Sequence, residues 1–140
     1  MKKDRETLES ELRSAKRIED YLTVNRDSLR DESFEELIAR TFRGKGITKA
    51  ELSRRSNSST VYIHQVFAGR RCPSRDKLLC LCIGMSAELD ETQELLLAAG
   101  YAPLRADFPR DVVIMHGLIR WKSLEQINDK LSETQLEQLD

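Results

Sequence analysis

The sequence predicts an all-α fold, and three observations support that prediction. Apolar residues recur three and four positions apart along most of the 140-residue chain, which is the spacing of an amphipathic helix. Serine, threonine or aspartate stands just before several of these apolar runs, as helix N-caps do. The chain has no strong alternation of apolar and polar residues, and no Asn-Gly or Asp-Gly pair that would favour a β-hairpin.

Three segments are predicted: a helical N-terminal extension (1–32), a central domain (33–100) and a helical C-terminal segment (101–140). Within the first segment we expect one helix over residues 4–30, with a break predicted between Asn25 and Asp31, a stretch rich in Asp, Ser and Asn. Its apolar stripe comprises Leu8, Leu12, Ala15, Ile18, Leu22 and Leu29. The stripe is thin and is interrupted by Glu19, so it suits either packing on the rest of the protein or pairing with a second copy.

Five helices are predicted in the central domain from their start and stop signals. The expected N-caps are Ser33, Thr48, Ser58 or Ser59, Ser74 and Asp90. Three of these caps are followed three residues later by Glu or Gln, which is the capping-box form. The expected helix ends are Gly44–Gly46, Asn57, Ala68–Gly69 and Gly100. Glycine and asparagine tolerate the left-handed backbone that follows many helices.

The C-terminal segment begins with a stretch bounded by prolines, residues 101–109, which we interpret as a linker or a packed loop. Two helices are predicted after it. The first covers residues 110–120, and the second begins at Ser123, with Gln126 three residues on. An apolar face that could cover the core or meet a second copy comprises Val112, Val113, Leu118, Ile119 and Trp121.

The net charge of −1 conceals an uneven distribution along the chain. Residues 33–75 hold nine Lys or Arg against three Asp or Glu, whereas residues 76–140 carry a net charge of −6. A basic block of this kind is typical of a surface that binds a polyanion, although chance clustering on a solvated face is the alternative. The acidic C-terminal part is a possible surface for a protein partner.

Several function classes are not predicted. The longest apolar run has six residues, far fewer than the roughly 20 that cross a bilayer, and no secretory signal precedes it. Cys72, Cys80 and Cys82 are therefore expected to be reduced thiols. The chain has no phosphate-binding loop, serine-nucleophile motif or zinc-protease motif. We expect a cytoplasmic protein that is not an enzyme and uses no cofactor and no metal ion.

The stretch from residue 46 to residue 82 resembles the helix-turn-helix of the Cro/cI-type (XRE) phage-repressor family. The matching residues stand at the family spacing without gaps: Ile47, Thr48, Glu51, Leu52, Ser59, Ile63, Gly69, Arg70, Pro73, Leu78 and Leu79. The resemblance covers roughly residues 34–98 and implies a five-helix lambda-repressor-like fold. Ser53, Asn57 and Phe67 depart from the usual Ala, Gly and Glu. The first two fit sterically, and Phe67 is expected to pack inward.

The resemblance implies that the helix over about residues 59–67 lies in the major groove of DNA and reads base edges. The expected base contacts are Thr60, Val61, Tyr62, His64 and Gln65. The expected phosphate contacts are Lys49, Ser58, Ser59, Arg70 and Arg71. This helix has neither Arg nor Lys, so a preference for A·T pairs is expected. Leu52, Ile63 and Val66 should face the core.

Together these features predict a sequence-specific transcriptional regulator that binds double-stranded DNA. A homodimer is expected, because one short helix reads few base pairs and two half-sites usually lie about 34 Å apart or a multiple of that. The alternative is a protein–protein interaction module that keeps the helix-turn-helix as a scaffold without specific DNA binding.

Overall fold

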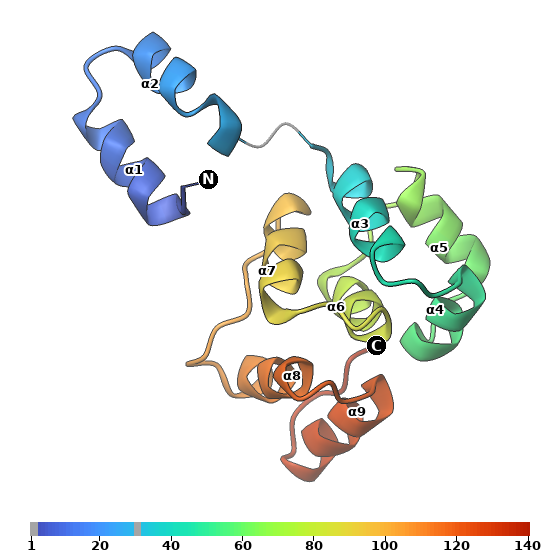
Figure 1. Ribbon diagram of the computed structural model, residues 1–140. Coiled ribbons are helices and arrows are strands. Elements are labelled where there is room, and N and C mark those ends of the chain that lie inside the picture. Colours follow the sequence, from blue (N-terminus) through green and yellow to red (C-terminus); the bar gives the residue numbers. More distant parts are fainter. Residues whose placement is uncertain (1–2, 30–31) are drawn as a thin grey trace. The chain divides into compact units, whose positions relative to one another are not determined.

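The computed structural model describes residues 3–29 and 32–140, and the chain divides into two compact units, residues 1–32 and 33–140. The described residues form nine α-helices, one 3-10 helix and no strand (Figure 1). The predicted all-α class is therefore confirmed. Within these described ranges, no helix has the length and apolar character needed to cross a bilayer.

The N-terminal unit contains α1 (Arg5–Ser14), α2 (Ile18–Val24) and a short 3-10 helix, η1 (Arg26–Ser28). The prediction of one uninterrupted helix up to Asn25 is therefore wrong, whereas the predicted break at Asn25 is confirmed, because α2 ends at Val24 and Asn25 is its C-cap. The backbone of Ala15 is extended, with φ −71° and ψ 130°, so the helical hydrogen-bond ladder ends there. The break allows α2 to turn back and contact α1, which a continuous helix could not do.

Helices α1 and α2, together with η1, form what we call the N-terminal hairpin. Hydrogen bonds between polar groups join its two arms. The Tyr21 hydroxyl donates to the carbonyl oxygen of Leu8 at 3.2 Å, and the backbone N–H of Lys3 donates to the Ser28 hydroxyl at 3.0 Å. Neither α1 nor α2 buries a side chain. The exposed apolar side chains are Leu12, Ile18, Leu22, Val24 and Leu29.

The first five helices of the second unit are α3 (Phe34–Arg43), α4 (Lys49–Ser56), α5 (Thr60–Phe67), α6 (Arg75–Gly84) and α7 (Leu89–Ala98). Four begin at predicted caps, and the hydroxyls that accept the first-turn N–H groups belong to Ser33, Thr48, Ser59 and Ser74. The predicted cap Asp90 is wrong. The N-cap of α7 is Glu88, whose backbone N–H donates to the Glu91 carboxylate at 2.8 Å.

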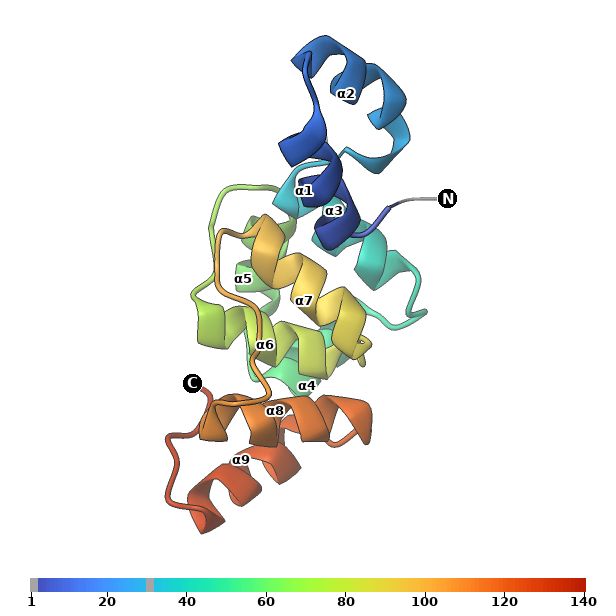
Figure 2. The same cartoon turned by 90° about the vertical axis from the view of Figure 1, so that its left-hand side faces the viewer.

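Helix α6 lies in the middle of this unit and packs against α4, α7 and α9 (Figures 1 and 2). Every residue of α6 from Leu78 to Gly84 is buried. Gly84 allows α4 to approach closely, because a Cβ at this position would lie 2.9 Å from the Cβ of Ser56 and 3.0 Å from its backbone nitrogen. Helix α6 therefore fixes the position of α4 through a contact that admits no larger side chain.

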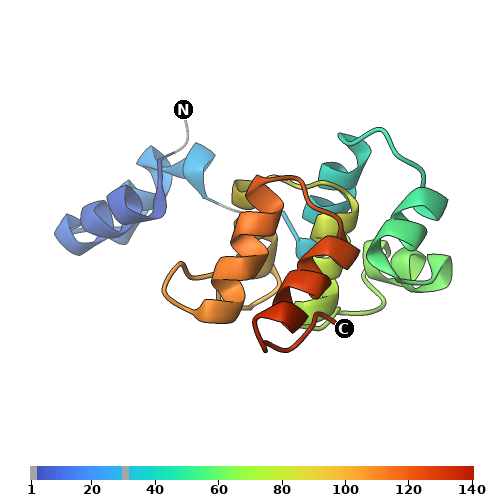
Figure 3. The same cartoon turned by 90° about the horizontal axis from the view of Figure 1, so that it is seen from below.

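Residues 101–140 pack in the same unit as residues 33–100. Helices α8 (Pro109–Ile119) and α9 (Leu124–Glu133) form a hairpin in which they lie side by side (Figure 3). The predicted capping box of Ser123 and Gln126 is confirmed. The predicted apolar face of α8 is divided. Leu118 is buried in the core and Val113 is half-buried, whereas the exposed members are Val112, Ile119 and Trp121.

The stretch before α8 is a packed loop. The side-chain amide of Gln93 donates to the carbonyl oxygen of Leu104 and accepts from its N–H, both at 2.8 Å. The Arg110 guanidinium forms two hydrogen bonds with the Asp76 carboxylate, at 3.0 and 2.8 Å, and this carboxylate raises the pKa of Arg110. Arg110 also donates to the backbone of Glu137, so it joins α6, α8 and the C-terminal end of the chain.

Candidate nucleic-acid interface

Helices α4 and α5 pack against each other and are joined by a turn of three residues. Asn57 adopts the left-handed backbone expected of it, with φ 53°, and ends α4. The Ser58 N–H then donates to the carbonyl oxygen of Ser53 at 3.1 Å, which closes the turn. Ile63 and Val66 of α5 are fully buried, as predicted, so the inner face of α5 is held by the core. The direction of α5 is therefore set by packing as well as by the turn.

The opposite face of α5 carries the residues predicted to contact bases. Thr60, Val61 and His64 are exposed, whereas Tyr62 and Gln65 are half-buried. Val61 is the clearest case, since 64% of this apolar residue remains accessible although its neighbours Ile63 and Val66 are fully buried. The structure thus places three of the five predicted base contacts fully on one exposed surface.

Tyr62 lies at the edge of that surface and also packs against the core. The Arg71 guanidinium lies over the Tyr62 ring, with its Cζ 5.3 Å from the ring centroid. Such a contact is a cation–π interaction, and it holds a positive charge beside α5. Burial raises the pKa of the Tyr62 hydroxyl even though Arg71 acts in the opposite direction, so this hydroxyl stays protonated near neutral pH.

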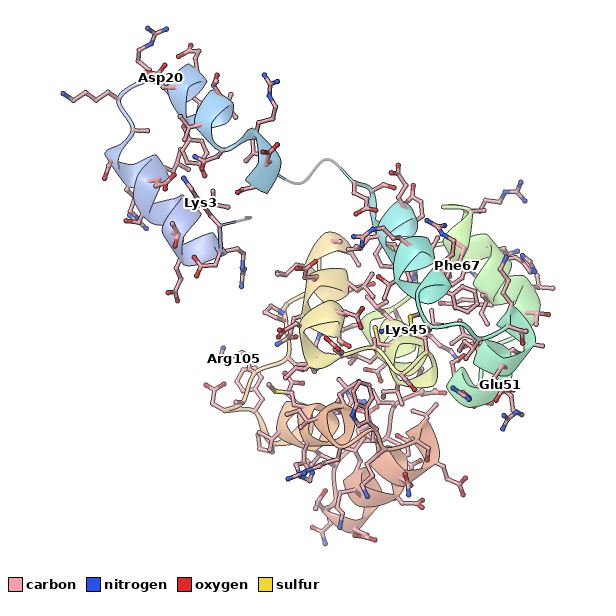
Figure 4. All side chains as sticks on the ribbon, in the orientation of Figure 1. Lys3, Asp20, Lys45, Glu51, Phe67 and Arg105 are labelled. Carbon is pink, nitrogen blue, oxygen red and sulfur yellow. The ribbon has the colours of Figure 1, made fainter. Side chains whose placement is uncertain are left out.

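Lys49, a predicted phosphate contact, is held by α5. Its Nζ lies 3.2 Å from Nδ1 of His64 and 5.8 Å from the centroid of the Phe67 ring. The Phe67 ring contacts Phe42 of α3, with centroids 5.2 Å apart, and lies on the side of α5 that faces α3 (Figure 4). The prediction that Phe67 packs inward is confirmed. Sequence reasoning missed the contact between Lys49 and His64, because these residues lie on different helices.

The two serines of the turn differ in what they can offer a phosphate. Ser58 is only 8% exposed, and its hydroxyl donates to the carbonyl oxygen of Ser56 at 3.3 Å, so its side chain offers little surface to a phosphate. The Ser59 hydroxyl accepts the Tyr62 N–H at 3.0 Å and keeps its own proton for another acceptor. Arg70 is exposed at the other end of α5, directly after Gly69.

The basic block of the sequence does not form one free cationic patch. Lys45 pairs with Glu91 at 2.6 Å, and Arg75 pairs with Asp111 at 3.5 Å. Burial by itself would raise the pKa of Glu91, but hydrogen bonds from Lys45 and from the Glu88 N–H together lower it. Two cations of residues 33–75 are therefore neutralised by the acidic part of the chain.

Other cations gather near the C-terminal end of α4. Arg54 and Arg55 both bond the Glu51 carboxylate, the latter at 3.0 Å. Lys77 donates to the carbonyl oxygen of Asn57 at 3.3 Å, which brings a further positive charge to the turn. Lys77 was not among the predicted contacts, because in the sequence it belongs to the acidic part of the chain, residues 76–140. Its position three residues after the predicted cap Ser74 already indicated that it lies in the first turn of a helix.

A groove of about 630 Å³ lies beside this end of α4 and is bounded by the end of α6 and the turn between α8 and α9. Its lining includes three residues with left-handed backbone, Asn57, Ser86 and Trp121, which follow within two residues of the last residue of α4, α6 and α8. The cations in the lining are Arg54, Arg55 and Lys122. Helix C-termini carry partial negative charge, so these cations offset a local field and do not by themselves indicate an anion site.

The cysteines are divided between surface and core. Cys72 is exposed, whereas burial raises the pKa of Cys80 to about 11 and that of Cys82 to about 12. Among the described residues, no group of three or more His, Cys, Asp or Glu side chains is placed to hold a metal ion.

No protein-family model matches this chain, and no curated protein or solved structure matches it either. Its function is therefore inferred from its own residues and geometry.

Proposed function

We propose that the protein is a sequence-specific, DNA-binding transcriptional regulator and that α5 enters the major groove. The observation that carries this proposal is the two-sided character of α5, which buries Ile63 and Val66 and exposes Thr60, Val61 and His64. An α-helix fits the major groove, and its outward side chains can reach the base edges there. The order of helices α3 to α7 supports the lambda-repressor-like arrangement that the sequence resemblance implies.

Several side chains on and beside the outward face of α5 have a chemical role in this proposal. Thr60 and Val61 can contact the methyl group of thymine, and Gln65 can form two hydrogen bonds with an adenine edge. Arg70 and Arg71, at the end of α5, supply charge for the phosphate backbone. We propose that two copies bind two half-sites, because one such helix reads only a few base pairs.

Selection of bound duplexes from a random pool by the full chain tests this function. A defined motif is expected, and affinity should fall with salt with a slope of about −0.9 for each phosphate contacted. Gln65→Ala should relax one base position by about 1–3 kcal/mol, whereas Arg70→Ala should weaken all sequences alike. Absence of binding to any duplex at low salt, or a flat salt response, contradicts the proposal.

A second candidate function is a protein-interaction module, and the exposed apolar side chains on and beside α8 favour it. They are Phe108, Val112, Ile119 and Trp121. In that case a partner should bind the full chain with an affinity that Val112→Lys reduces and Gln65→Ala leaves unchanged. DNA selection by the same protein would return no motif.

A further inference from the structure

We infer that Lys49 is a positioning residue for His64, and that His64 donates a hydrogen bond to an acceptor atom on the edge of one base. This inference rests on the proposed function of α5. It changes the role of Lys49 from a phosphate contact to a residue that determines sequence preference.

The position of Lys49 is not explained by the stability of α4. It is the first residue of that helix, directly after the N-cap Thr48. A cation at a helix N-terminus opposes the helix dipole and is unfavourable there. Its ammonium instead contacts two residues on adjacent turns of α5, with Nζ 3.2 Å from Nδ1 of His64 and 5.8 Å from the Phe67 ring centroid. Lys49 thus connects the start of α4 to the exposed face of α5.

This contact determines which nitrogen of His64 carries the proton. A lysine ammonium has three donors and no acceptor, so Nδ1 must accept the hydrogen bond. A neutral imidazole that accepts at Nδ1 carries its proton on Nε2. Nε2 lies across the ring from Nδ1, and His64 is exposed. The surface of α5 therefore presents a ring N–H donor beside Val61.

A single donor at this position discriminates among bases in the major groove. Guanine offers N7 and O6 as acceptors, adenine offers N7 and thymine offers O4, whereas cytosine offers only an amino donor. Cytosine opposite His64 would leave two donors facing each other. We therefore expect cytosine to be disfavoured at that one position by about tenfold.

The first test uses the free protein and needs no DNA. Ring-nitrogen NMR of the full chain, at a pH where His64 is neutral, should show an unprotonated Nδ1 that accepts a hydrogen bond and a protonated Nε2. Lys49→Met removes the donor while keeping a similar length, so the Nδ1 signal should move toward that of a free imidazole nitrogen. Lys49→Arg keeps a donor and should restore part of the shift. A proton on Nδ1 in the wild-type protein, or no response to Lys49→Met, overturns the inference.

The second test compares four duplexes that differ only at the base facing His64. Wild-type protein should bind the cytosine duplex about tenfold more weakly than the best of the four. His64→Ala and Lys49→Met should each remove this difference, and the double variant should do no more than either one. Gln65→Ala is a comparison variant: it should relax preference at a different base position and keep the tenfold discrimination against cytosine at this one.

A phosphate role for Lys49 gives a different result. Lys49→Met would then weaken all four duplexes equally and reduce the salt slope by about 0.9, and this outcome overturns the inference. If the wild-type chain binds no duplex at all, the proposed function fails, and with it the base contact of His64. The NMR result would still report whether Lys49 sets the proton position.

Discussion

The N-terminal hairpin and the unit of residues 33–140 both contain amphipathic helices, but they bury them very differently. Neither α1 nor α2 has a buried side chain, whereas α3 buries Leu37, Ile38 and Phe42 along one face. Both regions show apolar residues at helical spacing in the sequence. Helical periodicity specifies which face can be buried, but several helices must surround that face before burial stabilises it.

The difference also appears in the interactions that hold each region. The hairpin relies on polar contacts such as the pair of Lys3 and Glu11 at 2.7 Å. Partly exposed ion pairs contribute about 0–1 kcal/mol each. The larger unit instead has a continuous apolar core that includes Leu79, Ile114 and Leu131. We therefore expect the hairpin to open locally well before the larger unit unfolds.

The largest expected effect comes from removing one leucine from each region. Leu79 is 0% exposed and Leu12 is 46% exposed. Leu79→Ala should lower the free energy of unfolding by about 2–5 kcal/mol, because it leaves a cavity in the core. Leu12→Ala should change it by about 0.5 kcal/mol or less. Urea unfolding of the full chain measures both. Equal losses would mean that the hairpin stripe is covered in solution.

Substitution of two glycines by alanine, one at a time, tests the close contact between α4 and α6. Gly84→Ala should destabilise the protein by about 1–3 kcal/mol, because the new Cβ meets the backbone of α4. Gly44→Ala is the control, since its Cβ would find no atom nearer than 3.5 Å, and this variant should be neutral or slightly stabilising. Thermal unfolding of the two variants compares them. A harmless Gly84→Ala would show that the two helices can separate at little cost.

The rate at which the buried cysteines of α6 are alkylated measures how often this helix becomes exposed to solvent. Only the thiolate reacts with alkylating reagents, and burial raises the pKa of Cys80 to about 11 and of Cys82 to about 12. In the native protein at neutral pH, a brief alkylation followed by mass spectrometry should modify the exposed Cys72 alone. All three cysteines should react in denaturant. Native modification of Cys82 at the rate of Cys72 would show that the core opens frequently.

The smallest expected effect is the loosening of the hairpin in acid. The hydrogen bond from the Thr7 side chain, then that from its backbone, lowers the pKa of Asp4 below 3.8, and the hydrogen bond from Lys3 lowers that of Glu11 below 4.5. A lowered pKa in the folded state stabilises the hairpin above the unfolded pKa, and this contribution is lost as the pH falls through the folded value. The Cα chemical shifts of α1 should therefore lose helical character as the pH falls below the unfolded pKa values of these two carboxyls. Asp4→Asn should remove part of this pH dependence. Shifts that stay constant would show that these carboxylates do not support α1.

Local features were predictable because they depend on residues within one helical turn. The caps Ser33, Thr48, Ser74 and Ser123 were identified from the sequence, as was the left-handed Asn57. Asp90 failed although its pattern with Gln93 fits a capping box. Gln93 instead bonds the backbone of Leu104, so it is not available to α7. The capping box that does form is equally local and joins Glu88 and Glu91.

The sequence by itself determined the all-α class, most of the helix boundaries in residues 33–140 and the two faces of α5, since each follows from short-range hydrogen bonding and helical spacing. Only the tertiary structure decided where the charges lie. Lys45 meets Glu91 across 46 positions of the chain, and Lys49 meets His64 across 15. Side chains so far apart are brought together by the packing of α3 against α7 and of α4 against α5. No local pattern encodes that packing, because it depends on how all the buried faces of the unit fit together at once.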